Sequence, residues 1–150
     1  MVGAVLVTHA FIGRELIATV EYLLGNVDGI AAVSIEADAD VFKARTKIWQ
    51  AIKEVEQGDG VLIMTDLFGG TPSNLALSFL ANPNVEVITG VNLPMTLTFC
   101  TGRSEMQLGE LAKAVRLSGT RSVARARDLV EAKGVSRENR FIPNTQKHQP

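Results

Sequence analysis

The chain lacks three features that mark large classes of protein. It has a single cysteine, Cys100, in 150 residues, which excludes a disulfide framework and a zinc site built from paired cysteines. No apolar segment approaches the roughly 20 residues that a membrane-spanning helix requires. The apolar run at the start is too short for a signal peptide and has no basic flank. We therefore expect a cytoplasmic protein that does not span a membrane.

Strong charge and a nucleotide loop are also missing. The formal net charge is −1, and the basic residues of segment 103–140 alternate with acidic and apolar ones. This alternation is typical of a solvated helix surface, so we expect no nucleic-acid partner. The sequence contains no GxxxxGK[ST] motif, which argues against direct use of ATP.

What the chain does have is a regular alternation of apolar runs and helical periodicity. Hydrophobic residues make up 46% of the composition, enough for one domain with its own core. Strands are predicted over residues 2–8, 30–35, 61–65 and 85–89. The first run is nearly all apolar, as in a strand covered on both faces. The pattern predicts an α/β fold: a single doubly wound domain with a mostly parallel central sheet and helices on both faces.

Helical spacing of apolar residues fills the intervals between these strands. Helices are predicted over residues 16–24, 41–55 and 73–81. Segment 108–133 is predicted to be mainly helical, and segment 96–101 is ambiguous. Gly25 is expected to stop the first helix, and Asp40 to cap the second. We assign residues 1–134 to the domain and interpret residues 135–150 as a polar, mobile tail.

Polar residues gather where three predicted strands end, in "THAFIG", "TDLFGGTPSN" and "TGVNLPM". Ligands of such sheets bind beyond the carboxyl ends of the strands. These ends supply one imidazole, His9, and one carboxylate, Asp66. A carboxylate that accepts the proton of one ring nitrogen leaves the other nitrogen free to attack. Gly70 allows close backbone approach, and Thr71 is expected to cap the next helix and to donate to an oxyanion.

Each of these residues also has a plainer interpretation. His9 can be a polar residue that ends a strand, Asp66 can cap a turn, and "GGTP" can be an ordinary loop. Sequence spacing does not establish that His9 and Asp66 touch. The acidic group Glu36, Asp38 and Asp40 is interpreted as a solvated loop with a helix cap, so no metal site is predicted.

Three stretches in this order carry a resemblance: "VTHAFIGRELIATVEYLLG", "MTDLFGGTPSNLAL" and "VITGVNLPM". Together they resemble the mannose-family IIA component of the bacterial phosphoenolpyruvate-dependent sugar phosphotransferase system. The likeness runs from residue 2 to about residue 133, nearly the whole chain.

The resemblance implies a doubly wound α/β homodimer that acts as a phosphotransferase through a phosphohistidine. His9 matches the histidine that accepts a phosphoryl group from the phosphocarrier HPr and passes it to a IIB component. Membrane components, IIC and IID, then take part indirectly. Asp66 matches the aspartate that orients the histidine, and Gly70 and Thr71 match positions that border the phosphoryl group. No cofactor or metal is implied.

Two positions depart from the family pattern. The family commonly has glycine after the histidine, where this chain has Ala10, and serine is frequent where Thr71 stands. The added methyl of Ala10 narrows backbone freedom but keeps the amide donor, and Thr71 keeps the hydroxyl. We expect both changes to be tolerated.

Four other functions can be compared with this one, of which a regulatory role is the one that the sequence does not separate from sugar transport. The chain can be a IIA protein whose phosphorylation state controls a partner without sugar transport. The phosphotransfer subunit of dihydroxyacetone kinase shares the fold, but its loop is not of the "DLFGGTPSN" type. A response-regulator receiver needs acidic residues at the first strand end, where this chain has His9. A flavodoxin needs aromatic loop residues, but Trp49 and Tyr22 fall in predicted helices. Sugar specificity is not readable from the sequence.

Overall fold

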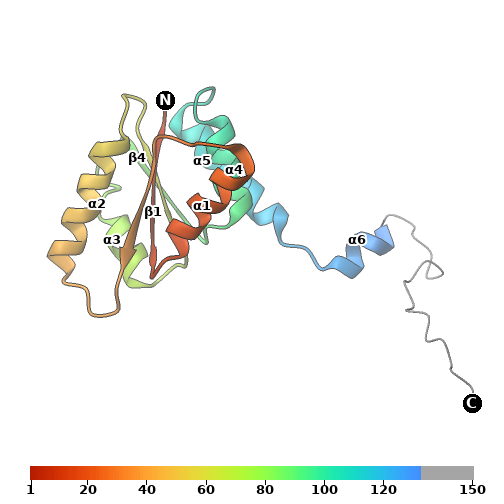
Figure 1. The fold of residues 1–150 in the computed structure, drawn as a ribbon, viewed down its shortest axis with the longest axis horizontal. Helices are drawn as coiled ribbons and strands as arrows, with labels where there is room; N and C mark the ends of the chain where they lie inside the picture. Colours follow the sequence, from red (N-terminus) through yellow and green to blue (C-terminus); the bar gives the residue numbers. More distant parts are fainter. Residues whose placement is uncertain (133–150) are drawn as a thin grey trace, which may run out of the picture.

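The described part of the protein is built around a parallel sheet of four strands (Figure 1). The computed structural model describes residues 1–132. The strands are β1 (Gly3–His9), β2 (Ile30–Ile35), β3 (Val61–Thr65) and β4 (Val85–Thr89). They lie in the order β2-β1-β3-β4, and every neighbouring pair is parallel. The predicted doubly wound α/β architecture is confirmed.

Within residues 1–132, six helices accompany the sheet. They are α1 (Ile12–Leu24), α2 (Val41–Val55), α3 (Thr71–Leu77), α4 (Leu93–Gly102), α5 (Leu108–Ser122) and α6 (Ala126–Ala132). Helices α2 and α3 cover one face, and α1, α4 and α5 cover the other (Figure 1). Helix α6 stands away from the sheet at the end of an extended segment (Figure 1).

The strands are apolar on both sides because each side faces a helix layer. In β1, Val5 and Val7 join the core under α2 and α3, whereas Ala4 and Leu6 join the core under α4 and α5. Successive side chains of a strand point to opposite faces, so a doubly covered strand reads as a continuous apolar run. This explains why the first run of the sequence shows no polar alternation.

The strand order fixes where a ligand site can form. From β1 the chain moves outward to β2, then crosses back past β1 to form β3 and β4. Strand order therefore reverses between β1 and β3, and their carboxyl ends flank the crevice in which such sheets bind ligands.

One predicted helix has different bounds in the structure, and one segment predicted to be mainly helical contains two helices. Helix α3 begins earlier than predicted and ends at Leu77, after which the chain continues in tighter turns that include the Ser78 N–H bond to the Leu75 carbonyl. Segment 108–133, predicted to be mainly helical, contains two helices in its described part: α5 ends at Ser122, and Val123 takes an extended conformation before α6. Val123 is 81% exposed, and none of the residues of α6 is buried.

Several local predictions are confirmed. Asp40 caps α2, because its Oδ1 accepts a hydrogen bond of 2.8 Å from the Lys43 N–H. Gly25 ends α1 with φ of 86°. The ambiguous segment 96–101 is part of α4, whose start is capped by the Asn92 side chain. Gly119 lets α5 approach α4, since a Cβ there would lie 2.5 Å from Met95 Cγ.

The proposed boundary between residues 134 and 135, and the tail after it, lie outside the described residues. Over residues 1–132, none of the helices combines the length and the apolar character needed to cross a membrane.

Candidate functional site

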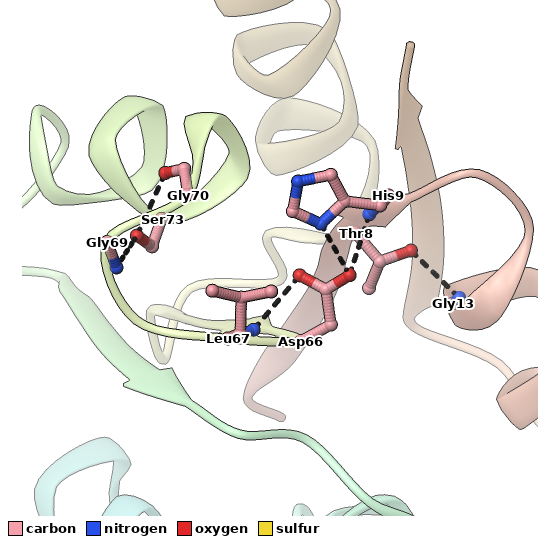
Figure 2. Close-up of polar contacts among 8 residues, drawn as sticks. All are labelled: Thr8, His9, Gly13, Asp66, Leu67, Gly69, Gly70 and Ser73. Carbon is pink, nitrogen blue, oxygen red and sulfur yellow. Dashed lines mark hydrogen bonds and ion pairs between the residues drawn. The ribbon is translucent and has the colours of Figure 1, made fainter. Parts of the chain in front are cut away.

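The structure brings His9 and Asp66 into contact at the switch point. His9 is the last residue of β1, and Asp66 follows the last residue of β3. The two strands are neighbours in a register that pairs Val7 with Thr65. The His9 ring nitrogen Nδ1 lies 2.8 Å from Asp66 Oδ2 (Figure 2). Two residues 57 positions apart thus meet because parallel strands end at the same edge.

The Asp66 carboxylate receives hydrogen bonds from the backbone as well as from the ring. Its Oδ2 also accepts from the His9 backbone N–H at 2.8 Å, and its Oδ1 accepts from the Leu67 N–H at 3.0 Å. Burial by itself raises the pKa of Asp66, but the His9 backbone and ring hydrogen bonds, the attraction of the imidazole and the Leu67 N–H outweigh it. The pKa of Asp66 is therefore below its ordinary value, and the carboxylate is ionised at neutral pH.

An ionised carboxylate only accepts hydrogen bonds, so the proton between the two side chains belongs to Nδ1 of His9. The neutral ring then carries its lone pair on Nε2. Within residues 1–132, Nε2 has no hydrogen-bond partner. The His9 side chain is 43% exposed, whereas Asp66 is only 9% exposed. In this pair, Nε2 of the half-exposed His9 ring is the nucleophilic atom, and the largely buried Asp66 carboxylate holds the ring in place.

A hydrogen bond between Thr8 and Gly13 fixes the turn after His9. Thr8 is buried, and its Oγ1 accepts a hydrogen bond of 2.9 Å from the Gly13 N–H in the first turn of α1 (Figure 2). Between them, Ala10 adopts a φ of +44°, in the left-handed region that favours glycine. This conformation gives a physical reason for the glycine common at this position in the family that the sequence resembles.

The loop after Asp66 places Gly70 against the imidazole. A Cβ on Gly70 would lie 2.9 Å from His9 Cε1 and 3.4 Å from Nε2, so a larger residue would press on the ring. The loop is fixed by Ser73, whose buried hydroxyl accepts from the Gly69 N–H at 2.9 Å and donates to the Gly70 carbonyl at 3.0 Å (Figure 2).

Two site expectations change with this geometry. Thr71 does not cap α3: the cap position is Gly70, without a side-chain hydrogen bond, and Thr71 is the exposed first residue of the helix. Ser73 was not predicted as part of the site. Ser73 is the third residue of the helix, a position from which a side chain can reach back to the preceding backbone, but the segment lacks the Glu or Gln of a capping box, so the sequence carries no clear signal for this contact.

Exposed apolar side chains lie close to His9 and Asp66 in the sequence. Phe11 and Ile12 come shortly after His9, and Leu67 and Phe68 follow Asp66; all four are exposed, Phe68 by 73%. Arg14 lies above the Phe11 ring at 5.6 Å. The site is therefore an open surface with an apolar rim. Residues 1–132 contain no cluster of three or more histidine, cysteine, aspartate or glutamate side chains suited to a metal ion.

Comparison with known proteins identifies the family of the chain. A family model described as "PTS system fructose IIA component" matches residues 3–116. The chain belongs to that family, the IIA (EIIA) components of the sugar phosphotransferase system (PTS). Family membership makes it a phosphocarrier component of a sugar PTS and assigns it to phosphoryl transfer in general.

Individual relatives cover most of this EIIA chain. It is 27% identical over 123 residues to a fructose-specific EIIA component of Bacillus subtilis, covering 81% of this chain and 84% of the relative. It is 30% identical over 108 residues to a sorbose-specific EIIA component of Lacticaseibacillus casei, covering 71% and 78%. A mannose/sorbose-specific IIA subunit of Enterococcus faecalis superposes with a TM-score of 0.73 at 26% identity, covering 82% of this chain and 92% of that structure.

Proposed function

We propose that this EIIA protein accepts a phosphoryl group from phosphorylated HPr on His9 Nε2 and passes it to a IIB component during sugar uptake. The observation that carries the proposal is the 2.8 Å contact between His9 Nδ1 and Asp66 Oδ2, which leaves Nε2 as the only basic ring atom facing solvent.

The chemistry follows from this arrangement. The Nε2 lone pair attacks the phosphorus atom of the incoming group, and the bond from phosphorus to the donor breaks. The ring becomes positively charged while Nδ1 keeps its proton, and the Asp66 carboxylate stabilises that charge at 2.8 Å. Because Asp66 also binds the His9 backbone N–H, the ring is aligned before the donor arrives. Transfer onward to IIB reverses the same steps.

Gly70 and Thr71 are proposed to border the phosphoryl group. Gly70 lies against the Nε2 side of the ring, and its missing side chain leaves room there. Within the described residues, the backbone N–H groups of Gly70 and Thr71 donate no hydrogen bond. Free N–H groups at the start of a helix attract phosphate oxygens and stabilise their negative charge.

The open, apolar surroundings favour protein partners over a small substrate. An enzyme for a small molecule encloses its substrate in a pocket, whereas Nε2 lies on an exposed surface. The exposed Phe11, Leu67 and Phe68 side chains supply the apolar contact that a transient protein interface requires.

The direct test is incubation with phosphoenolpyruvate, enzyme I and HPr, followed by intact mass spectrometry and peptide mapping. We expect one acid-labile phosphoryl group on the peptide that contains His9. His9→Ala should abolish labelling, while His148→Ala, which removes the other histidine, should leave it unchanged. Phosphorylation of Asp66, or none, would overturn the proposal.

We further propose that the protein works in the cytoplasm as a homodimer, with IIC and IID components downstream. Light scattering at micromolar concentration should give about twice the monomer mass of 16.1 kDa. A purely monomeric species would reject the dimer without affecting the His9 chemistry.

A further inference from the structure

A second surface feature lies outside the histidine site. A groove of about 490 Å³ runs between α2 and the turn that follows α3. It is lined by Phe42, Arg45, Thr46, Trp49, Ser78, Phe79, Ala81 and Asn82. None of these residues belongs to the His9 site, and the phosphoryl chemistry does not use them.

Helix α2 carries two stripes, only one of which packs on the sheet. Its core stripe is formed by Ala44, Ile48, Ala51, Ile52 and Val55. The second stripe is Phe42, Arg45, Thr46 and Trp49, at the i, i+3, i+4, i+7 spacing of one helix face. Phe42 is 79% exposed and Trp49 is 42% exposed. Two large aromatic residues on one solvent-facing stripe are costly unless something covers them.

The aromatic floor of the groove is ordered and lies beneath cations. The Trp49 and Phe79 rings are stacked, with centroids 6.4 Å apart and planes inclined by 6°. The Arg45 guanidinium lies 5.5 Å from the centre of Phe79, and the Lys53 ammonium lies 5.0 Å from the centre of Trp49. These cation–π contacts hold both positive charges at the edge of the groove.

The charge at the groove is of one sign. Among residues 1–132, none of the residues that line it is acidic. Within residues 1–132, neither Arg45 nor Lys53 forms an ion pair with an acidic side chain. Helix α2 carries four basic residues (Lys43, Arg45, Lys47 and Lys53) against one acidic residue, Glu54, in a chain whose net charge is −1. The positive charge is therefore local to this helix, and it complements a negatively charged partner.

We propose that this groove is a docking site for an acidic peptide segment of a partner protein, with one large apolar side chain as its anchor. The anchor packs on Phe42 and Trp49, and the carboxylates pair with Arg45 and Lys53 at the rim. The stripe from Phe42 to Trp49 spans eight residues of helix, and the seven steps between them cover roughly 10 Å, which matches two turns of an amphipathic helix. The proposal does not depend on the phosphoryl-carrier role of His9.

Trp49 is the only tryptophan in the chain, so its fluorescence reports directly on the groove. The probe is a 12-residue synthetic peptide of glutamate, leucine and phenylalanine in a helical pattern. Two comparison peptides replace every glutamate by lysine, or every leucine and phenylalanine by serine. We expect a saturable change of Trp49 emission with the acidic amphipathic peptide alone, weakened by added salt because the ion pairs are exposed.

Paired variants separate the groove from general charge effects. Arg45→Glu should weaken binding by about tenfold or more, which corresponds to about 1.4 kcal/mol. Lys113→Glu makes the same charge change on the exposed surface of α5 and should leave binding unchanged. Phe42→Ser should weaken binding, whereas Phe11→Ser, an exposed aromatic residue next to His9, should not. Urea midpoints close to that of the unaltered protein show that the variants fold.

The result that overturns the proposal is the absence of saturable binding, an equal response to the lysine peptide, or equal losses in Arg45→Glu and Lys113→Glu. A change of Trp49 emission with protein concentration alone also overturns it, because a second copy then fills the groove. His9→Ala should bind the acidic peptide with unchanged affinity. Peptide binding and phosphorylation of His9 are therefore independent measurements, and either proposal can fail without the other.

Discussion

Each of the two edges of the sheet carries a pair of hydrogen-bonded side chains that joins distant parts of the sequence and includes one aspartate. At the carboxyl edge, His9 meets Asp66. At the amino edge, Arg103 meets Asp28. The exposures are reversed: His9 is 43% exposed on a buried aspartate, whereas Arg103 is 5% exposed beneath an aspartate that is 73% exposed.

The two pairs differ in whether a side-chain nitrogen remains without a hydrogen bond within the described residues. Arg103 donates from Nε to the Val2 carbonyl, from Nη1 to the Asp28 carbonyl and carboxylate, and from Nη2 to Gln57. Gly29 makes room for this guanidinium, since a Cβ there would overlap it. All three guanidinium nitrogens are occupied. His9 keeps Nε2 unused, so one pair is built for stability and the other leaves an atom for chemistry.

Arg103→Met should therefore act on stability. We expect the free energy of unfolding to fall by about 3 kcal/mol, because the Val2 and Asp28 carbonyls lose a buried, charge-assisted donor. Urea denaturation measures the change. Arg125→Met removes the exposed pair with Asp128 and should cause no measurable loss. If both variants unfold at the same urea concentration as the unaltered protein, the amino edge is not the stabilising one.

Asp66→Asn should instead act on transfer. We expect transfer from HPr to slow by about a hundredfold, or about 2.7 kcal/mol in barrier, because the neutral amide no longer stabilises the charged ring. Nitrogen NMR should show the His9 proton shared between Nδ1 and Nε2 in place of residence on Nδ1. Asp38→Asn, in the exposed loop after β2, is the matched control. An unchanged rate together with an unchanged tautomer would remove the positioning role of Asp66.

The same pair predicts a dependence of stability on acid. The folded-state pKa of Asp66 is lower than its unfolded value of 3.8, so folding favours the ionised form. This contribution is fully present above the unfolded pKa and is lost as the pH falls through the folded pKa. Asp66→Asn should therefore show a shallower loss of stability below about pH 4. Parallel curves for the two proteins in urea titrations at each pH would contradict this.

The strand ends could be predicted because they depend on local pattern alone. Four apolar runs and the helices between them place His9 and Asp66 after the first and third strands, and the parallel topology brings those ends to one edge. The 2.8 Å contact needs the register of Val7 with Thr65, which no single-sequence pattern encodes. The same register lets one oxygen of Asp66 bind both the ring and the backbone N–H of His9.

What the sequence failed to predict depends on neighbours far along the chain or on backbone angles. Segment 108–133 is mainly helical as predicted, but the apolar pattern does not indicate the break between α5 and α6 at the exposed Val123. Thr71 was favoured as a cap by residue type, but the chain enters α3 one residue earlier, at Gly70. Ser73 has the residue type of an ordinary helix position, and its hydrogen bond with the Gly69 N–H depends on the backbone path of the loop.

Gly70→Ala tests how closely the loop approaches the reactive atom. The new Cβ would lie 2.9 Å from His9 Cε1, so either the ring or the loop must move away from the position that favours transfer. We expect transfer to slow by about tenfold with little change in stability. Gly109→Ala, where a Cβ meets nothing within 4 Å, is the matched control for the added methyl. Equal transfer rates in Gly70→Ala and Gly109→Ala would show that the loop can move without loss of the reactive geometry.

Ala10→Gly is expected to have the smallest effect, a change in the free energy of unfolding that tests whether the backbone after His9 is strained. Ala10 has a φ of +44° directly after His9, a conformation that costs a non-glycine residue about 1 kcal/mol. Glycine should relieve that strain and raise the free energy of unfolding by up to about 1 kcal/mol. Ala37→Gly, in a loop where φ is not positive, should lower it slightly, because glycine adds only unfolded-state entropy there. Opposite signs for the two variants in urea denaturation would place strain at the reactive edge of the sheet. Equal losses would mean that the Thr8 contact with Gly13 holds the turn without strain.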